Sequence, residues 1–238
     1  MTALLLGVMV LLFAGNIVYQ IIKYYPLLKD GQDLTKIVKE ENFRAALSKL
    51  FASAIVTEED LQRLEEGSNP TLGNPEAKVK VVEYIDLDCT YCKNSEPAAR
   101  LLAENHPDDV YLIFKDFPVT ELHPRAERAA VAARCVFMQN DTARYWRFHD
   151  LLFQTQGNRT DEDLSRFAQQ TGADMQKYER CYSSDQELEA VRKSVQDGMA
   201  LGVRGTPTLF FNGVKIQGDM DLKSLETVVE EAMKVINR

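Results

Sequence analysis

The stretch from Val79 to Cys92 reads VKVVEYIDLDCTYC and decides the fold. Its first part is rich in β-branched and apolar residues, which is typical of a strand buried in the middle of a sheet. The two cysteines follow, and residues from Cys92 to about Glu104 have the composition of a helix. A second apolar run, Val110 to Phe114, predicts another strand. The order strand, CxxC, helix, strand therefore predicts a βαβ unit with the cysteines at the start of its helix.

The cysteines of this motif are Cys89 and Cys92, and their position suits thiol chemistry. The species that attacks in disulfide exchange is a thiolate. Free N–H groups and the dipole at a helix N-terminus stabilise that negative charge. We therefore expect Cys89 to be the nucleophile, and Cys92, one turn along, to resolve a mixed disulfide.

The alternative for this motif is one half of a zinc site. A closed zinc site prefers a second Cys or His pair at close spacing. The other cysteines, Cys135 and Cys181, are isolated, and the three histidines of the chain complete no usual spacing. The sequence therefore predicts no metal site and no cofactor.

Strands return near the C-terminus. Asn212-Gly213 lies between the apolar runs 208–211 and 214–216, which predicts a hairpin, because a type I′ turn requires positive φ at both turn residues. An amphipathic helix over Leu222 to Ile236 follows. The region from about residue 119 to 200 is rich in Ala, Leu, Arg, Glu and Gln and predicts a helical block inserted into an α/β domain.

The CTYC motif, joined to Gly205-Thr206-Pro207-Thr208 before the hairpin, resembles the DsbA-like branch of the thioredoxin superfamily. The resemblance covers about residues 70–238, and the helical block fits the inserted domain of that branch. It implies a thioredoxin-like α/β fold and a protein disulfide oxidoreductase. It also implies that Pro207 is cis and faces the cysteines, so that the backbone of Thr206 can pair with a substrate strand beside Cys89.

The resemblance also suggests roles for residues around the cysteines. Glu83 matches a buried acid that relays a proton to or from the resolving thiol, and Lys115 matches its basic partner in some relatives. An ordinary acid at a strand end and a surface lysine are the alternative. Cys135 and Cys181 match a second cysteine pair, which the resemblance implies to form a structural disulfide. The alternative is that both are inert buried thiols.

The sequence departs from the best-known strong oxidants between its two cysteines. Thr90 stands where they have Pro, and Tyr91 stands where they have a His that helps hold the thiolate. Both residues are expected in the substrate-binding surface. Asp86 and Asp88 should oppose a negative charge at Cys89. These departures leave the direction of electron flow open.

The N-terminus predicts a membrane anchor. Residues 3–22 carry no charged side chain, and twenty residues of helix match the thickness of a bilayer core. A cleaved signal peptide is the alternative, although no basic residue precedes the run and no A-x-A-like site closely follows it. Residues 23–68 predict a helical linker made of two short helices, or one broken helix, and a further helix after Thr57. The linker either packs on the domain at 69–238 or forms a dimerisation stalk, so the oligomeric state stays open.

Charge and chemistry together predict where the protein works. A net charge of −8 without a cluster of Lys and Arg argues against nucleic-acid binding. Lysines after the anchor would favour a cytoplasmic domain if taken alone. A disulfide catalyst, however, belongs in an oxidising compartment, so we expect an extracytoplasmic domain, periplasmic or extracellular.

The expected function is the oxidation of thiols in exported proteins. Its partners would be thiol-containing protein substrates and a membrane redox protein that reoxidises the cysteine pair. Two alternatives stay open. One is a disulfide isomerase or reductase, and the other is a specialised thiol carrier in metal or cytochrome assembly.

Overall fold

A computed structural model describes residues 16, 19–20, 22–23 and 34–236 of the chain. Most of the expected anchor at residues 3–22 lies outside these residues. Within them, no helix combines the length and the apolar character that a membrane crossing needs. The anchor therefore stays a prediction.

The chain divides into two compact units, Met1–Lys49 and Leu50–Arg238. The helix at their junction is α2, Leu34–Ser53. It is continuous, so the expected break within this region was wrong. No Gly or Pro interrupts the segment, and its many Ala, Leu, Lys and Glu residues favour helix throughout, so the change of apolar face does not end the helix.

The second unit is built on a five-stranded sheet of order β1-β3-β2-β4-β5. Strands β2 and β3 are parallel, and the other neighbouring pairs are antiparallel. The strands are β1 Thr71–Gly73, β2 Val79–Ile85, β3 Val110–Asp116, β4 Thr208–Phe211 and β5 Val214–Gln217. The short edge strand β1 was not predicted, because three residues are too few to show an alternating pattern.

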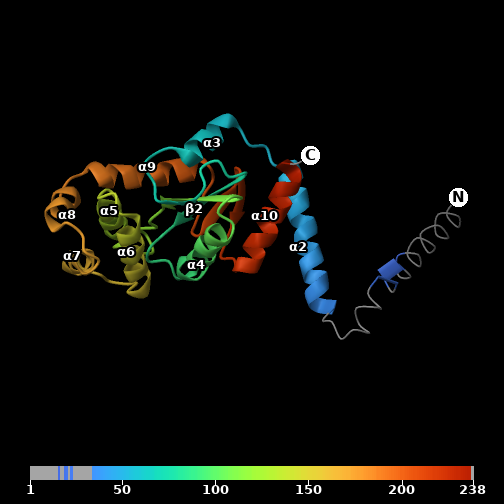
Figure 1. Cartoon of the computed structure of the whole chain (residues 1–238), viewed down its shortest axis with the longest axis horizontal. Helices are drawn as coiled ribbons and strands as arrows, with labels where there is room; N and C mark the ends of the chain where they lie inside the picture. Colours follow the sequence, from blue (N-terminus) through green and yellow to red (C-terminus); the bar gives the residue numbers. More distant parts are fainter. Residues whose placement is uncertain (1–15, 17–18, 21, 24–33, 237–238) are drawn as a thin grey trace. The chain divides into compact units, whose positions relative to one another are not determined.

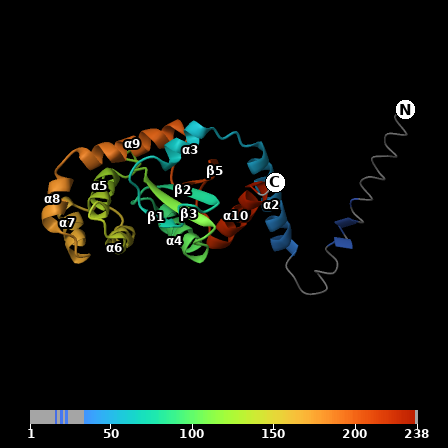
Figure 2. The same ribbon diagram turned by 45° about the horizontal axis from the view of Figure 1, so that its top comes forward.

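Helices cover both faces of this sheet and gather at one end of it. Helices α4 and α10 lie on one face, and α3 and α9 lie on the other (Figure 1). Figure 2 shows α5 to α8 together beyond the sheet, and all four lie within the region 119–200 that was predicted to be helical. The last helix of that region, α9, lies on a face of the sheet instead. The helices are α3 Glu58–Glu65, α4 Thr90–Asn105, α5 Ala126–Phe137, α6 Thr142–Gln154, α7 Asp161–Gln170, α8 Met175–Tyr182, α9 Gln186–Ala200 and α10 Leu222–Ile236.

The alternation along β2 separates two parts of the core. Val82 and Tyr84 face α3 and α9 and pack with Leu64 and Phe210. Helix α9 approaches this cluster closely at Gly198, where an added Cβ would lie 2.9 Å from the rings of Tyr84 and Phe117. The other face of β2 carries Glu83 toward α4, the helix that begins at the cysteines.

The helical block is joined to the sheet and to itself by buried links. A disulfide between Cys135 and Cys181 connects α5 to α8 across a sequence separation of 46 residues. Arg134, also on α5, contacts Glu187 at 2.7 Å and Asp116 at the end of β3 at 3.5 Å. These contacts hold the helical block at the end of the sheet where the central strands β2 and β3 terminate.

Candidate active site

Cys89 occupies the N-cap of α4, directly after the end of β2. The turn between them is closed by Asp86, whose carbonyl accepts the Cys89 N–H at 3.0 Å and whose carboxylate accepts the Asp88 N–H at 2.7 Å. The first helical bond then runs from Lys93 N–H to the Cys89 carbonyl. This geometry leaves the N–H groups of the first helical turn directed toward the Cys89 side chain.

The two thiols of the motif differ in environment. Both are free, Cys89 with 6 % of its surface exposed and Cys92 with none. A hydrogen bond from the Cys92 thiol, together with bonds from Thr206 and from the backbone of Cys92 and Tyr91, lowers the pKa of Cys89 to about 5. Burial and the neighbouring Cys89 raise the pKa of Cys92 far above its ordinary value. At neutral pH the reduced pair is therefore one thiolate and one thiol.

Thr206 and Pro207 lie beside these sulfurs. The peptide bond between them is cis, and the Thr206 carbonyl oxygen is 3.4 Å from Cys89 Sγ. The segment reaches this position because β4 pairs with β2 at Thr208 and Tyr84, which sets the residues before β4 at the end of β2 that leads to the cysteines. Thr90 and Tyr91 are exposed next to it, Tyr91 with 63 % of its surface.

Glu83 lies beneath α4 and is completely buried. Ser95, one turn after Cys92, donates its hydroxyl to Glu83 Oε1 at 3.1 Å. Burial outweighs this bond and the charge of Arg100, so the pKa of Glu83 is raised to about 7. Such a carboxyl can give or take a proton near neutral pH.

Lys115 is not the basic partner of Glu83. It pairs across the sheet with Tyr84, whereas Glu83 pairs with Phe114, so the lysine extends to the opposite face. There its ammonium donates to the Glu66 carbonyl. The basic residue near Glu83 is Arg100, which the sequence did not identify because it comes from α4 rather than from the sheet.

A second buried acid, Glu96, was also missed. Arg100 Nε lies 2.6 Å from Glu96, and His149 Nδ1 on α6 lies 3.7 Å from it. Burial raises the pKa of Glu96 to about 7. In the sequence, Glu96 looks like any other polar residue of α4, so no local pattern indicates that it is buried.

The acids expected to oppose the thiolate each contact a basic residue from a distant loop. His123 Nδ1 lies 2.8 Å from the Asp86 carboxylate, and Arg159 donates to the Asp88 carboxylate. Gln156 reinforces the turn by donating to the Cys89 carbonyl at 2.9 Å. His123 is one of the three histidines whose spacing completes no zinc site, and no spacing in the sequence links it to the CxxC motif.

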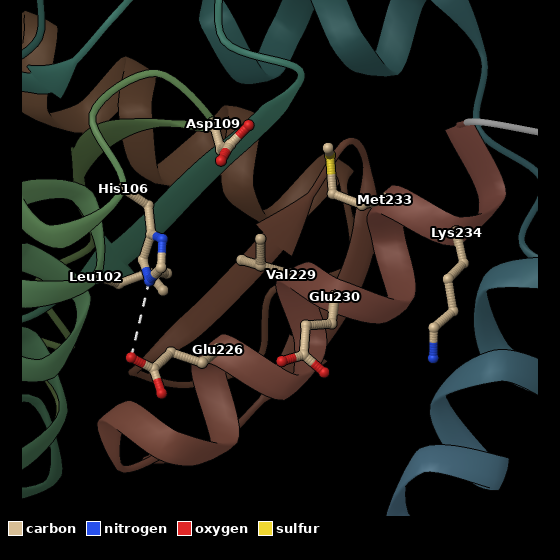
Figure 3. A pocket seen from close by; sticks show the side chains of 8 residues that line it. All are labelled: Leu102, His106, Asp109, Glu226, Val229, Glu230, Met233 and Lys234. Carbon is tan, nitrogen blue, oxygen red and sulfur yellow. Dashed lines mark ion pairs between the residues drawn. The ribbon is translucent and has the colours of Figure 1, made fainter.

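Another hollow lies away from the cysteines. It measures about 590 Å³, between the C-terminal end of α4 and α10. Figure 3 shows His106 and Glu226 facing each other there, 3.8 Å apart. The length of α4, about 24 Å at 1.5 Å per residue, separates His106 from Cys89. No group of three or more potential metal ligands occurs in the part of the chain that the structure describes.

A family model described as "Thioredoxin" matches residues 65–231. A thioredoxin-like oxidoreductase from Silicibacter pomeroyi DSS-3 is 27 % identical, with a TM-score of 0.64, over 75 % of this chain and 98 % of that one. The thiol-disulfide exchange protein alpha-DsbA2 from Wolbachia pipientis shares the fold at 23 % identity, with a TM-score of 0.65, over 79 % and 96 %. The family-model match shows the thioredoxin family, and the two solved structures confirm the thioredoxin-like fold expected from the resemblance to DsbA-like proteins.

The curated relatives carry a different name. Na(+)/H(+) antiporter NhaA 1 from Salinispora arenicola is 32 % identical over 160 residues, which are 67 % of this chain and 24 % of the antiporter. A second antiporter, from Salinispora tropica, matches to the same extent. This chain therefore spans about a quarter of the length of the curated relatives it matches.

Proposed function

This chain belongs to the thioredoxin family, and we propose that it oxidises thiols of exported proteins through Cys89 and Cys92. The asymmetry of the pair carries the proposal, because Cys89 has a pKa of about 5 while Cys92 is buried with a raised pKa. A low thiol pKa stabilises the reduced enzyme and so makes its disulfide a better oxidant. Known CxxC centres range from about 7 in thioredoxin to about 3.5 in DsbA, and this value lies between them.

The reaction has two steps. A substrate thiolate attacks Sγ of Cys89 in the Cys89–Cys92 disulfide, which forms a mixed disulfide and releases Cys92. The second substrate thiolate then attacks its own partner sulfur, which forms the substrate disulfide and releases Cys89 as a thiolate. Two electrons pass from the substrate to the enzyme, one proton stays on Cys92 and the other goes to solvent.

The surrounding residues have assigned roles in this scheme. Glu83 supplies the proton that Cys92 needs when it leaves, because its own pKa is about 7 and Ser95 connects it to α4. The backbone of Thr206 holds the substrate strand next to Cys89, since its carbonyl is 3.4 Å from the sulfur. Exposed Thr90 and Tyr91 form the surface against which the substrate lies.

We assign the catalytic domain to the extracytoplasmic side. The disulfide between Cys135 and Cys181 supports this, because such bonds persist in oxidising compartments. The uncharged run at residues 3–22 supports a membrane anchor. A membrane redox protein would then take the two electrons from the reduced pair and regenerate the disulfide.

A trapping experiment tests the function. In Cys92→Ala protein Cys92 can no longer attack the mixed disulfide, so adducts between Cys89 and substrates last longer and can be identified by mass spectrometry. Many secreted proteins in the adducts are expected, and Cys89→Ala protein is the control that should capture none. A single cytochrome or copper-protein client would instead support the thiol carrier, and the absence of Cys89 adducts would reject thiol exchange altogether.

A labelling experiment tests the location. A membrane-impermeant thiol reagent applied to intact cells should modify reduced Cys89 without lysis. Labelling that appears only after lysis would overturn the extracytoplasmic assignment. The Cys89→Ala variant controls for modification of other thiols.

A further inference from the structure

The carboxylate of Asp86 lies at the turn that carries Cys89 and is fully buried. Its Oδ1 accepts the Asp88 N–H at 2.7 Å, and its Oδ2 accepts the Val119 N–H at 2.7 Å. The imidazole of His123 completes the arrangement, with Nδ1 at 2.8 Å from Oδ2. Asp86 therefore binds the β2–α4 turn and the loop after β3 together, three residues before the nucleophile.

The position of His123 is set by its own backbone. Its N–H donates to the Val119 carbonyl at 2.8 Å, so the loop turns back and directs the ring toward Asp86. The side chain keeps 27 % of its surface exposed and lines a small cavity of about 130 Å³ with Asp88, Leu122 and Arg125. The imidazole can therefore exchange protons with solvent although its partner is buried.

The charges around His123 come from three segments. The β2–α4 turn contributes Asp86, Asp88 and Cys89, and each of these three favours the charged imidazole. The loop before α7 contributes Arg159, which is paired with Asp88. On the histidine's own loop, Arg125 is paired with Asp161. Arg159 also feels the charge of Asp86, but its ion pair is with Asp88, and His123 is the basic group that contacts the Asp86 carboxylate directly.

We propose that His123, held by Asp86, is a positioning residue that keeps Cys89 ionised and makes the strength of the nucleophile depend on pH. The two residues between the cysteines, Thr90 and Tyr91, are not basic, and His123 supplies the positive charge from a neighbouring loop instead. The proposal rests on the proposed thiol–disulfide function and adds to it the group that regulates it.

The direction of the pH effect follows from the charges. Protonated His123 and Asp86 together have no net charge, so they do not oppose the Cys89 thiolate. Burial alone would lower the pKa of His123, but the hydrogen bond and charge of Asp86 and the charge of Cys89 raise it. When pH rises through that value the imidazole becomes neutral, and Asp86 then opposes the thiolate. The reduced enzyme loses stability, and its disulfide becomes a weaker oxidant.

The main test compares histidine variants in a Cys92→Ala background, where the thiolate of Cys89 is followed by its ultraviolet absorbance. The His123→Gln variant loses one positive charge near Cys89, so its apparent Cys89 pKa should rise by about one unit. At a pH below that pKa, the fraction of Cys89 present as thiolate should therefore fall about tenfold. His123→Lys, which keeps a positive charge, should restore it. His106→Gln is the matched control, because His106 lies at the far end of α4 (Figure 3).

A second measurement does not depend on any substitution at the site. The imidazole resonances of His123 in wild-type protein should titrate at higher pH in the reduced form than in the oxidised form, because only the reduced form carries a thiolate. Equal values in the two forms, or a Cys89 pKa unchanged in His123→Gln, would overturn the proposal.

The result is separable from the proposed function. If wild-type protein oxidises dithiols but His123→Gln has an unchanged Cys89 pKa, only the role of His123 fails. If wild-type protein exchanges no disulfides, the proposed function fails, while the thiolate titration still reports on His123. Should His123→Gln not fold, the resonance comparison on the wild type decides alone.

Discussion

Cys89 Sγ lies 3.4 Å from the carbonyl oxygen of Thr206, across a sequence separation of 117 residues. The Thr206 side chain also helps to lower the pKa of Cys89. A segment far from the CxxC motif in sequence thus places a backbone carbonyl beside the nucleophile, and its side chain affects the charge state of that thiol.

Replacing Thr206 with Val should raise the pKa of Cys89. The change removes the hydroxyl that stabilises the thiolate and leaves a side chain of similar shape. A hydrogen bond to a charged group is strong enough to shift the value by roughly one unit. Titration of the thiolate in Cys92→Ala protein measures it, and Thr206→Ser should stay close to wild type. Equal pKa values in all three proteins would contradict the role of the hydroxyl.

Replacing Arg159 with Met should destabilise the protein. Its guanidinium and the Asp88 carboxylate are 4 % and 5 % exposed, so the change leaves a buried carboxylate without its partner. Removing one partner of a buried pair costs about 3–5 kcal/mol. Urea unfolding measures the loss. The double variant Asp88→Asn with Arg159→Met should recover much of it, and strictly additive losses would refute the pairing.

Replacing Glu83 with Gln should change how stability depends on pH. The pKa of Glu83 rises from 4.5 to about 7 on folding, so the folded state binds the proton more tightly. Stability from this group is present below pH 4.5 and is lost as pH rises toward 7. The Gln variant does not lose this stability, so above pH 7 its free energy of unfolding should exceed that of wild type by up to about 3 kcal/mol.

Unfolding free energies of both proteins across this pH range test the prediction. The two curves should converge at low pH, where Glu83 is protonated in both the folded and the unfolded wild type. Glu76→Gln at an exposed position is the matched control and should follow wild type. A constant difference between Glu83→Gln and wild type at all pH values would show that packing, not ionisation, sets the effect.

Removing the disulfide should lower stability and leave the CxxC chemistry intact. The bond between Cys135 and Cys181 closes a loop of about 46 residues, for which the chain-entropy model gives roughly 4 kcal/mol. The variant with both cysteines changed to Ala should unfold at lower denaturant concentration. The Cys89 pKa should match wild type, because the disulfide lies in the helical block. A shifted Cys89 pKa would reveal coupling between the two pairs.

Replacing Gly198 with Ala should cost about 1–3 kcal/mol through overpacking. The added Cβ would lie 2.9 Å from ring atoms of Tyr84 and Phe117, which are held within the core. Gly205→Ala is the control, because its Cβ would meet its nearest neighbour, the Gln217 side chain, at an ordinary 3.6 Å. Thermal unfolding compares the two, and equal melting temperatures would argue that α9 moves away without cost.

The strand, the cysteine motif and the hairpin turn around the site could be predicted because their sequence signals are local. The apolar run of β2, the CxxC after it and Asn212-Gly213 each specify a conformation from neighbouring residues alone. The predicted break in the helix that is now α2 was wrong, because helix propensity is also a local signal and was outweighed in the prediction by the apolar pattern. The change of apolar face pointed to a break, yet helix propensity continues through the segment.

The roles of individual charges could not be predicted in this way. The sequence indicated that Asp86 and Asp88 would oppose the thiolate, and it associated Lys115 with Glu83. Strand register sends Lys115 to the opposite face. Loop folding brings basic side chains to the two acids from 37 and 71 residues away. Neither register nor loop path has a signature in short-range spacing.

The sequence by itself determined that a thiol pair begins a helix after a buried strand, because side-chain periodicity and helix capping act between near neighbours. Only the tertiary structure decided what surrounds that pair. Thr206, His123 and Arg159 reach Cys89 and its two acids through packing of the sheet, the loops and the helical block. The electrostatic environment of a thiol depends on distances in space, and those distances exist only once the chain has folded.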